Sequence, residues 1–163
     1  MTVVRLAVAD DAEAIRAIYN PAVLTSTVTF DIVPRTLPDQ RAWLADHDGA
    51  HPATVAVDDD GAVAGFGSLS PWRPRAAYAT SVEDSVYVRE DRQGAGVGRL
   101  ILMDLLDRAR GHGFHAVFAR IVGGHEASIA LHEACGFERV GVEREVGRKL
   151  GRWLDVSVME QLL

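Results

Sequence analysis

The sequence predicts an α/β fold in which helices flank a mixed β-sheet. Segments whose apolar residues alternate with polar ones, as in strands, take turns along the chain with segments of helical periodicity. Of the 163 residues, 48% are hydrophobic, which is enough for a buried core, and no flexible linker interrupts them. We therefore expect a single domain over residues 1–163.

The first half of the chain predicts two helices and a β-hairpin. Asp10 or Asp11 can cap the first helix, and Pro38 lies in the first turn of the second, where its missing N–H is tolerated. The Asp60-Gly61 pair between two apolar runs is a strong turn signal. The expected elements are a strand at 2–8, helices from 10 or 11 to about 23 and at 36–48, and hairpin strands at 53–57 and 62–70.

The second half alternates strands and helices after a loop at 71–80. Gly136 predicts the end of the last helix, because glycine readily takes the left-handed conformation that ends helices. The expected elements are a strand at 82–89, a helix from about 96 to 111, a strand at 116–122, a helix from about 126 to 135, and strands at about 137–145 and 153–162.

Charge and cysteine content narrow the class of function. The net charge is −6, from 17 basic and 23 acidic side chains, which disfavours nucleic acid or an anionic membrane as the main partner. Cys135 is the only cysteine, so no internal disulfide can form, and the N-terminus has no charged-then-apolar export leader. The sequence also lacks metal-ligand spacing. We expect a cytoplasmic protein that binds no metal.

The residues from Gln93 to Gly98 read Gln-Gly-Ala-Gly-Val-Gly and join a predicted strand to a predicted helix. Glycine lets the backbone curl so that several N–H groups point at one spot, and the helix dipole adds partial positive charge there. Arg99 and Leu100 stand where a nucleotide P-loop needs Lys and Ser or Thr, and the glycines lie too deep in the chain for a dinucleotide fingerprint. The loop therefore predicts either a different phosphate-bearing ligand or a tight connection without a ligand.

Residues 93–98 resemble the pyrophosphate loop of the GNAT superfamily of N-acetyltransferases, which bind acetyl-CoA. The order of the predicted elements also agrees with that family. The resemblance implies a GNAT fold, with a splayed central sheet flanked by helices. Further segments, spread over essentially the whole chain, resemble its phosphinothricin and methionine sulfoximine acetyltransferase subgroup: Tyr19-Asn20, Thr29-Phe30-Asp31, and residues 70–73, 85–88, 128–133 and 151–156.

The resemblance also implies the activity. It points to an N-acetyltransferase that moves the acetyl group of acetyl-CoA directly to the amino group of a small amino acid or analogue, such as phosphinothricin, methionine sulfoximine or methionine sulfone. Such an activity is linked to antibiotic or herbicide resistance. The alternatives are a GNAT enzyme that acts on a protein N-terminus or a polyamine, and a non-catalytic CoA-binding module. The residues near the closing hairpin could line the cleft or a dimer surface, and we favour the dimer surface because the subgroup is usually dimeric. These residues are Lys149, Trp153 and Asp155.

Two residues are candidates for proton transfer. Glu83 is acidic within an otherwise apolar strand, and a partly buried carboxylate suits a general base, the role that the resemblance also implies. The alternative is a solvated strand residue or an ion-pair partner of Arg73 or Arg75. Asp84, which faces the other side of the strand, is the weaker choice of base. His132 lies where the subgroup places a histidine, so the resemblance implies a role as an acid or in orienting the substrate. A structural histidine is the alternative.

The resemblance assigns two kinds of contact to acetyl-CoA. The backbone of Val86, Tyr87 and Val88 would pair with the pantetheine arm like an added strand, and the glycine loop would hold the pyrophosphate through its N–H groups. His125 occupies the place where relatives carry an asparagine that bonds the pantetheine. Ser128 would lie beside the cofactor or be simply a residue in the first turn of the helix. The loop residues in this set are Gln93, Gly94, Ala95, Gly96, Val97 and Gly98.

The acceptor side is predicted from the loop before the central strand. Arg73 and Arg75 can hold an anionic group in forked hydrogen bonds, and Tyr78 can wall the pocket. Phe30 can cover the apolar stem of a small substrate. A proline-braced surface loop with ordinary arginines is the alternative. The predicted substrate-binding set is Phe30, Arg73, Arg75, Tyr78, Glu83 and Ser85.

Overall fold

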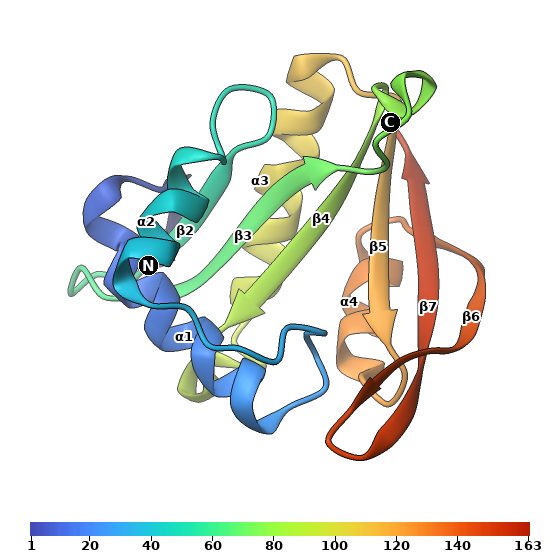
Figure 1. Ribbon diagram of the computed structural model, residues 1–163. Helices are drawn as coiled ribbons and strands as arrows, with labels where there is room; N and C mark the ends of the chain where they lie inside the picture. The colour runs from blue at the N-terminus through green and yellow to red at the C-terminus, as the bar shows by residue number, and fades with distance from the viewer.

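A seven-stranded β-sheet forms the centre of the protein in the computed structural model, which describes residues 1–163 (Figure 1). The strand order is β1-β2-β3-β4-β5-β7-β6, and every neighbouring pair is antiparallel except β4 and β5. The predicted mixed sheet is therefore confirmed. The strands are β1 (Val3–Leu6), β2 (Ala53–Val57), β3 (Val63–Pro71), β4 (Ser81–Val88), β5 (Ala116–Val122), β6 (Glu138–Lys149) and β7 (Arg152–Leu162).

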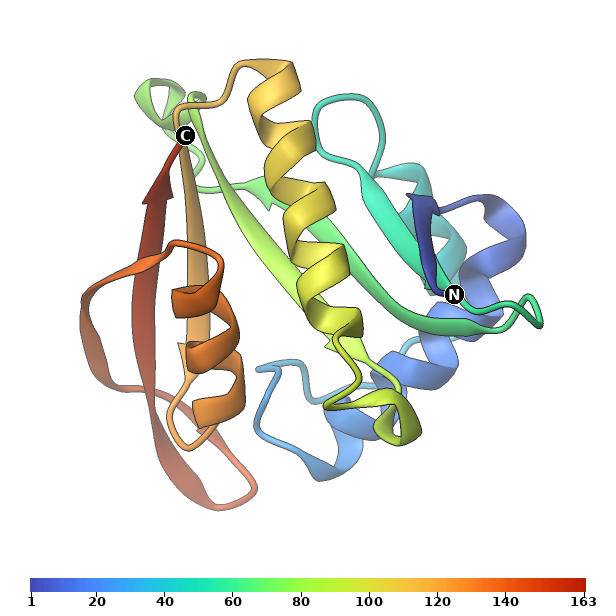
Figure 2. The ribbon, with the colours of Figure 1, turned by 180° about the vertical axis from the view of Figure 1, so that it is seen from behind.

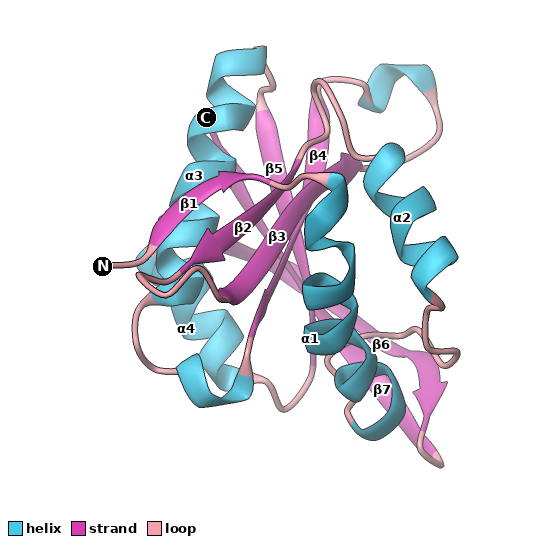
Figure 3. Ribbon diagram, turned by 90° about the vertical axis from the view of Figure 1, so that its left-hand side faces the viewer, coloured by secondary structure: helices cyan, strands magenta, loops and turns pink.

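Four α-helices cover the two faces of the sheet. The helices α1 (Ala12–Thr25) and α2 (Leu37–Ala45) lie on one face, and α3 (Val97–His112) and α4 (Glu126–Ala134) lie on the other, as the side view in Figure 3 shows. None of them is both long and apolar enough to span a bilayer. Short 3₁₀ turns lie at Ala9–Asp11, Ala76–Tyr78 and Glu90–Arg92.

The main core lies between α3 and the sheet, on the face seen in Figure 2. Leu102, Leu105 and Leu106 of α3 are fully buried there. At Gly67 of β3, a Cβ atom would come within 2.5 Å of the Ile101 side chain, so glycine is what allows α3 to approach the sheet this closely. A smaller cluster on the opposite face joins Ile15, Tyr19 and Val23 of α1 to Val55 and Phe66 of the sheet.

The strands β4 and β5 separate after a short stretch of parallel pairing. Ser81–Glu83 pairs with Ala116–Phe118, and beyond that point the two strands share no register. They diverge toward the lower part of Figure 1, which gives the sheet the splayed form that the family resemblance implies. Backbone groups that face such a gap have no strand partner, so an extended ligand can pair with them.

The element boundaries agree with the sequence prediction to within a few residues, but two details differ. Asp11 stands at the N-cap of α1, yet its carboxylate accepts hydrogen bonds from Arg5 and from the amide of Val8 and caps nothing in α1. The strand β6 continues to Lys149, beyond its predicted end near residue 145. Two shifts in its register with β7 disturb the alternation on which the prediction depends.

Candidate active site

A cavity of about 600 Å³ occupies the gap between β4 and β5, a size usual for small-molecule sites. The separated halves of the two strands form its floor, α1 and the segment after it cover one side, and α4 covers the other. The structure thus brings many of the predicted site residues together. Those that line the cavity are Ser85, Val86, Tyr87, Val88, Gln93, His125, Ser128 and His132.

The glycine loop leads into the first turn of α3. Gly94 and Gly96 have positive φ angles of 74° and 82°, and Gly96 is the N-cap of the helix. The amides of Gln93 and Ala95 donate to carbonyls of the preceding turn. Unpartnered amides at a helix N-terminus, where the helix dipole is positive, form an anion-binding site. The amides that donate to no acceptor in the protein are those of Gly94, Gly96, Val97, Gly98 and Arg99.

Gly98 has a different role from the other two glycines of the loop. It lies within α3, and a Cβ atom there would be 3.2 Å from the side chain of Leu131 and 3.5 Å from that of Val88. Gly98 therefore allows α3 to pack closely on α4 and β4, whereas only Gly94 and Gly96 provide the left-handed turns of the loop.

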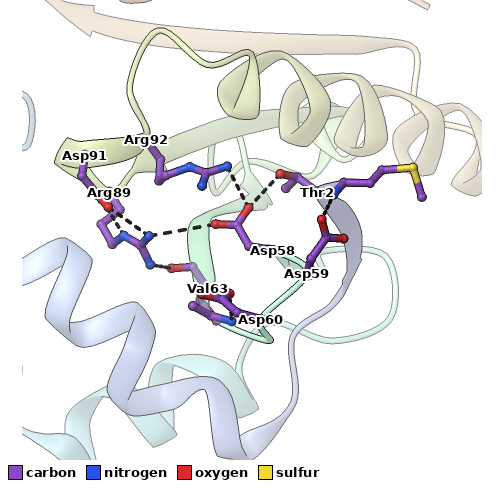
Figure 4. Close-up of polar contacts among 10 residues, drawn as sticks. Thr2, Asp58, Asp59, Asp60, Val63, Arg89, Asp91 and Arg92 are labelled. Carbon is purple, nitrogen blue, oxygen red and sulfur yellow. Dashed lines mark hydrogen bonds and ion pairs between the residues drawn. The ribbon is translucent and has the colours of Figure 1, made fainter.

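An ion-pair network holds the turn that precedes the loop (Figure 4). Asp58, in the turn between β2 and β3, accepts hydrogen bonds from Arg92 Nη2 at 2.9 Å and from Thr2 Oγ1 at 2.8 Å. Arg89 pairs with Asp91 beside it. The start of the loop is thereby tied to the turn between β2 and β3.

Glu83 lies where the pairing of β4 with β5 ends, on the sheet face that α1 covers. Burial raises the pKa of its carboxyl, while the charge of Arg120 on β5, and more weakly that of Arg73, opposes the rise. Glu143 of β6 pairs with both of these arginines. A buried carboxyl with a raised pKa suits proton abstraction. We refer to Glu83, Arg73, Arg120 and Glu143 as the mixed-charge cluster.

Arg73 is held in the mixed-charge cluster by stacking as well as by charge. Its guanidinium lies 4.6 Å from the ring of Trp72, which stacks in parallel on Phe118 of β5 at 4.3 Å. The Nη2 atom of Arg73 lies 3.9 Å from Oε1 of Glu143. This end of the loop is therefore anchored to the sheet beside Glu83.

The remaining acceptor-side predictions have mixed outcomes. Phe30 rests on β6, where a Cβ atom on Gly147 would come within 2.4 Å of its ring, and its side chain stays partly exposed. Arg75 and Tyr78 are exposed in the loop between β3 and β4 and do not line the cavity. Their contact with a substrate stays a prediction.

His125 lies at one end of the cavity. Its Nε2 atom lies 3.0 Å from Oγ1 of Thr27, which belongs to the segment after α1. Burial lowers the pKa of the His125 imidazole, which favours the neutral ring. No hydrogen bond within the protein involves its Nδ1 atom, and the contact of His125 with the pantetheine arm stays a prediction.

His132 has partners for both ring nitrogens. Nδ1 lies 2.7 Å from the carbonyl oxygen of Ser128, and Nε2 lies 3.0 Å from Oδ1 of Asp84. Both side chains are buried, with exposed fractions of 4% for His132 and 1% for Asp84. Because successive strand residues face opposite sides, this pair lies on the other face of the sheet from Glu83.

Lys149 does not lie at the surface as expected. It is buried, and its ammonium donates to the carbonyl oxygen of Thr29 at 2.8 Å and more weakly to that of Ala22. Burial lowers the pKa of this amine. Lys149 therefore ties the β6–β7 turn to the segment after α1, whereas Trp153 is exposed.

The family comparison agrees with this geometry. Residues 13–137 match the acetyltransferase (GNAT) family. The chain belongs to the GNAT family. It is an acetyl-CoA-dependent N-acetyltransferase, and the cleft between β4 and β5, with the free amides at the start of α3, fits the extended, phosphate-bearing co-substrate of such an enzyme.

Three relatives of this GNAT enzyme are informative. The L-methionine sulfoximine/L-methionine sulfone acetyltransferase of Pseudomonas paraeruginosa is 42% identical over 151 residues, which cover 92% of this chain and 88% of the relative. The crystal structure of a GNAT superfamily phosphinothricin acetyltransferase from Sinorhizobium meliloti in complex with AcCoA has a TM-score of 0.95 and 38% identity, covering 99% and 88% of the two chains. The crystal structure of a ribosomal-protein-alanine N-acetyltransferase from Brucella melitensis also has a TM-score of 0.95, with 37% identity and 99% of both chains covered.

Arg120 is a charged cavity residue of this GNAT enzyme that the predicted site did not include. It lies on the cavity wall and pairs with Glu143 next to Glu83. A signal was present, because Arg120 is a charged residue between Ala119 and Ile121 in an apolar strand. The same signal identified Glu83.

Proposed function

We propose that this enzyme acetylates the amino group of a small amino acid analogue, such as methionine sulfoximine, methionine sulfone or phosphinothricin. The observation that carries the proposal is the mixed-charge cluster beside the end of the β4–β5 pairing, of which Arg120 lines the cavity. A zwitterionic acceptor needs both signs of charge there, a carboxylate near its amine and guanidinium groups for its own acidic groups. The names of two close relatives support the same class of acceptor.

We assign the binding of acetyl-CoA to the backbone of the cleft. The unpaired edge of β4 at Val86, Tyr87 and Val88 would bind the pantetheine arm, as an added strand binds a sheet edge. The free amides from Gly94 to Gly98 would hold the pyrophosphate, and His125 and Ser128 would contact the arm from α4. The co-substrate supplies a thioester carbonyl, which a neutral amine attacks.

Glu83 is the general base of this proposal. Its raised pKa makes it a competent acceptor of the amine proton, and Arg120 and Arg73 keep its ionised form accessible. The same two arginines would hold the acidic groups of the acceptor, while Ser85 and Phe30 would contact its remaining atoms.

A thiol-release assay with acetyl-CoA tests the proposal directly. The amines to compare are methionine sulfoximine, methionine sulfone, phosphinothricin, polyamines and short peptides with a free N-terminus. We expect kcat/KM for at least one of the three amino acid analogues to exceed that for every peptide and polyamine by about tenfold or more, because a matched polar site discriminates strongly. Release of thiol with peptides alone would contradict the small-acceptor proposal.

Acetylation of a protein N-terminus is the second candidate, because one structural relative bears the name of a ribosomal-protein-alanine N-acetyltransferase. Against it, the mixed-charge cluster is built from side chains with pairs of opposite charge, which suits a compact zwitterion. The two arginines of the mixed-charge cluster also disfavour a polyamine acceptor, because like charges repel. The peptide and polyamine arms of the assay measure both alternatives.

We also propose that the enzyme is a homodimer that pairs through the β6–β7 hairpin. Figure 3 shows this hairpin extending past α1 at one end of the sheet, and β6 is an edge strand. Light scattering should give a mass near twice the 17.7 kDa of the chain, and a mass near 17.7 kDa itself would contradict the proposal. The exposed apolar side chains of the hairpin are Val140, Val142, Val146, Leu150, Trp153 and Leu162.

We propose a cytoplasmic enzyme that acts as one N-acetyltransferase domain over residues 1–163. One sheet built from both ends of the chain supports the single domain, and the unpaired thiol of Cys135 supports a reducing compartment.

Acetylation removes the charge of the acceptor amine, so the activity would confer resistance to a toxic amino acid analogue. Growth of cells with and without the gene on methionine sulfoximine measures this role, and equal growth would contradict it.

A further inference from the structure

Glu143 of β6 bridges the two arginines of the mixed-charge cluster. Its Oε1 atom lies 3.9 Å from Nη2 of Arg73, and its Oε2 atom accepts a hydrogen bond from Nη2 of Arg120. All three side chains are partly exposed, with fractions of 31% for Glu143, 45% for Arg73 and 30% for Arg120. Solvent reaches them, and a small ligand can contact them for the same reason.

The register of the sheet places Glu143 and Arg120 on one face. The strand β7 lies between β5 and β6. Arg120 pairs with Val158 of β7, and Glu143 pairs with Val156, two residues away on the same strand. Residues two apart on a strand face the same side, so the two side chains meet across β7. Glu83 shares this face, because its register partner on β5 comes two residues before Arg120.

Arg120 pairs with Glu143 but is not saturated by it. The hydrogen bond to Glu143 is the only one that the guanidinium of Arg120 donates within the protein, and its buried Nε atom has no acceptor. A guanidinium carries five N–H donors. Arg120 also lines the cavity. It therefore keeps free donors for one further anion, while its charge is already shared with Glu143.

The charges of the mixed-charge cluster balance. With Glu83 ionised, as a general base must be, the cluster holds two positive and two negative side chains. Asp84 also acts on Glu83, but it faces the other side of the sheet and pairs with His132. A neutral cluster complements an acceptor that is neutral overall, with one ammonium, one carboxylate and an uncharged headgroup.

The amino acid analogues differ in this respect. Methionine sulfone has one carboxylate and an uncharged sulfone, whereas phosphinothricin has a carboxylate and an anionic phosphinate. Two arginines can balance two negative charges, but one of these charges is always that of Glu143. A second acidic group on the acceptor would lie close to this carboxylate, and like charges repel.

We propose that Glu143 is a specificity-determining residue that limits the acceptor to one acidic group, so that methionine sulfone is preferred over phosphinothricin. The inference rests on the proposed acetylation of small amino acid analogues. Glu143 takes the place of the second anion that the two arginines could otherwise bind. It is a repulsive element built into the site, and such elements give specificity by weakening the binding of the wrong ligand.

Thiol release with the two analogues, in the wild type and in Glu143→Gln, tests the inference. We expect the wild-type kcat/KM for methionine sulfone to exceed that for phosphinothricin by about tenfold or more. In Glu143→Gln this ratio should fall by about tenfold, because glutamine keeps the shape but not the charge. Glu138→Gln is the control, since it removes the same charge from an exposed site on the same strand that does not line the cavity, and the ratio should stay unchanged.

Two results of this assay would overturn the inference. One is an unchanged ratio in Glu143→Gln. The other is a wild-type enzyme that acetylates phosphinothricin as well as or better than methionine sulfone, and this result decides the question even where the variant does not fold.

The pH profile is a second readout, which a merely steric role of Glu143 would not move. The charge of Glu143 raises the pKa of Glu83, in the same direction as burial and Asp84 and against Arg120 and Arg73. The rising limb of kcat/KM for methionine sulfone should therefore move to lower pH in Glu143→Gln. A limb at the wild-type pH would contradict a role through charge.

Calorimetric titration of each analogue, with coenzyme A present, separates this inference from the proposed function. The wild type should bind methionine sulfone more tightly than phosphinothricin by about tenfold or more, and Glu143→Gln should narrow the difference. Selective binding without thiol release from any amine would refute the proposed acetylation and support the role of Glu143. Equal affinities of the wild type for the two analogues would overturn that role.

Discussion

Glu83→Gln should lower kcat by about a hundredfold or more and leave the affinity for acetyl-CoA nearly unchanged. The loss follows because an amide cannot take up the amine proton, and general base catalysis contributes about 10²- to 10⁴-fold. Affinity should survive because the co-substrate is assigned to the backbone of β4 and of the glycine loop, which the substitution does not alter. Steady-state kinetics and calorimetry with acetyl-CoA separate the two quantities.

The pH dependence gives this prediction a second readout. Burial raises the pKa of Glu83, so the wild-type kcat/KM should climb with pH as the carboxyl loses its proton, and Glu83→Gln should lack that limb. Glu138→Gln is a matched control, since Glu138 is exposed in β6 and does not line the cavity. Unchanged turnover in Glu83→Gln would remove Glu83 as the base.

Leu105→Ala should lower the free energy of unfolding by about 2–5 kcal/mol, the usual effect of leaving a cavity in a core. Leu105 is fully buried in α3, where it packs beneath the sheet and beside Gly67. Because α3 lies so close to β3, neighbouring atoms have little freedom to move into the cavity that the substitution would leave. Urea unfolding measures the difference, which is a large part of the stability of an ordinary domain.

Leu100→Ala is the matched control for that measurement. Leu100 lies in the same helix but is 46% exposed, so the same substitution there removes few buried contacts. We expect a change within about 0.5 kcal/mol. Equal effects of the two substitutions would contradict the burial pattern assigned to α3.

Much of the fold could be predicted because local rules and tertiary packing agree along most of the chain. The apolar run at residues 116–122 is an example, since the predicted strand and β5 coincide. Thr36 caps α2, and Pro38 lies in the first turn of this helix, as expected. Where two bulges interrupt β6, the period-two pattern breaks, and the predicted strand ended too early.

For the site residues, prediction from sequence fails for a different reason. Glu83 and Arg120 are both charged residues in apolar strands, but only the parallel pairing of β4 and β5 brings them together. The partner of His132 is 48 residues away along the chain, and its distance in space depends on how α4 packs on the sheet. Lys149 likewise looks like a surface residue in the sequence, but the fold places it against one carbonyl of α1 and one of the segment after it.

The sequence alone determined the order of strands and helices, the glycine loop before a helix, and the family, because each of these depends on short-range periodicity and contiguous motifs. Only the tertiary structure decided which of these groups share a face, which amides stay free and which charges lie within reach of each other. The reason is physical: Asp84 and Glu83 are neighbours in sequence, yet the pleat of β4 turns them to opposite faces, one to pair with His132 and the other to join the mixed-charge cluster.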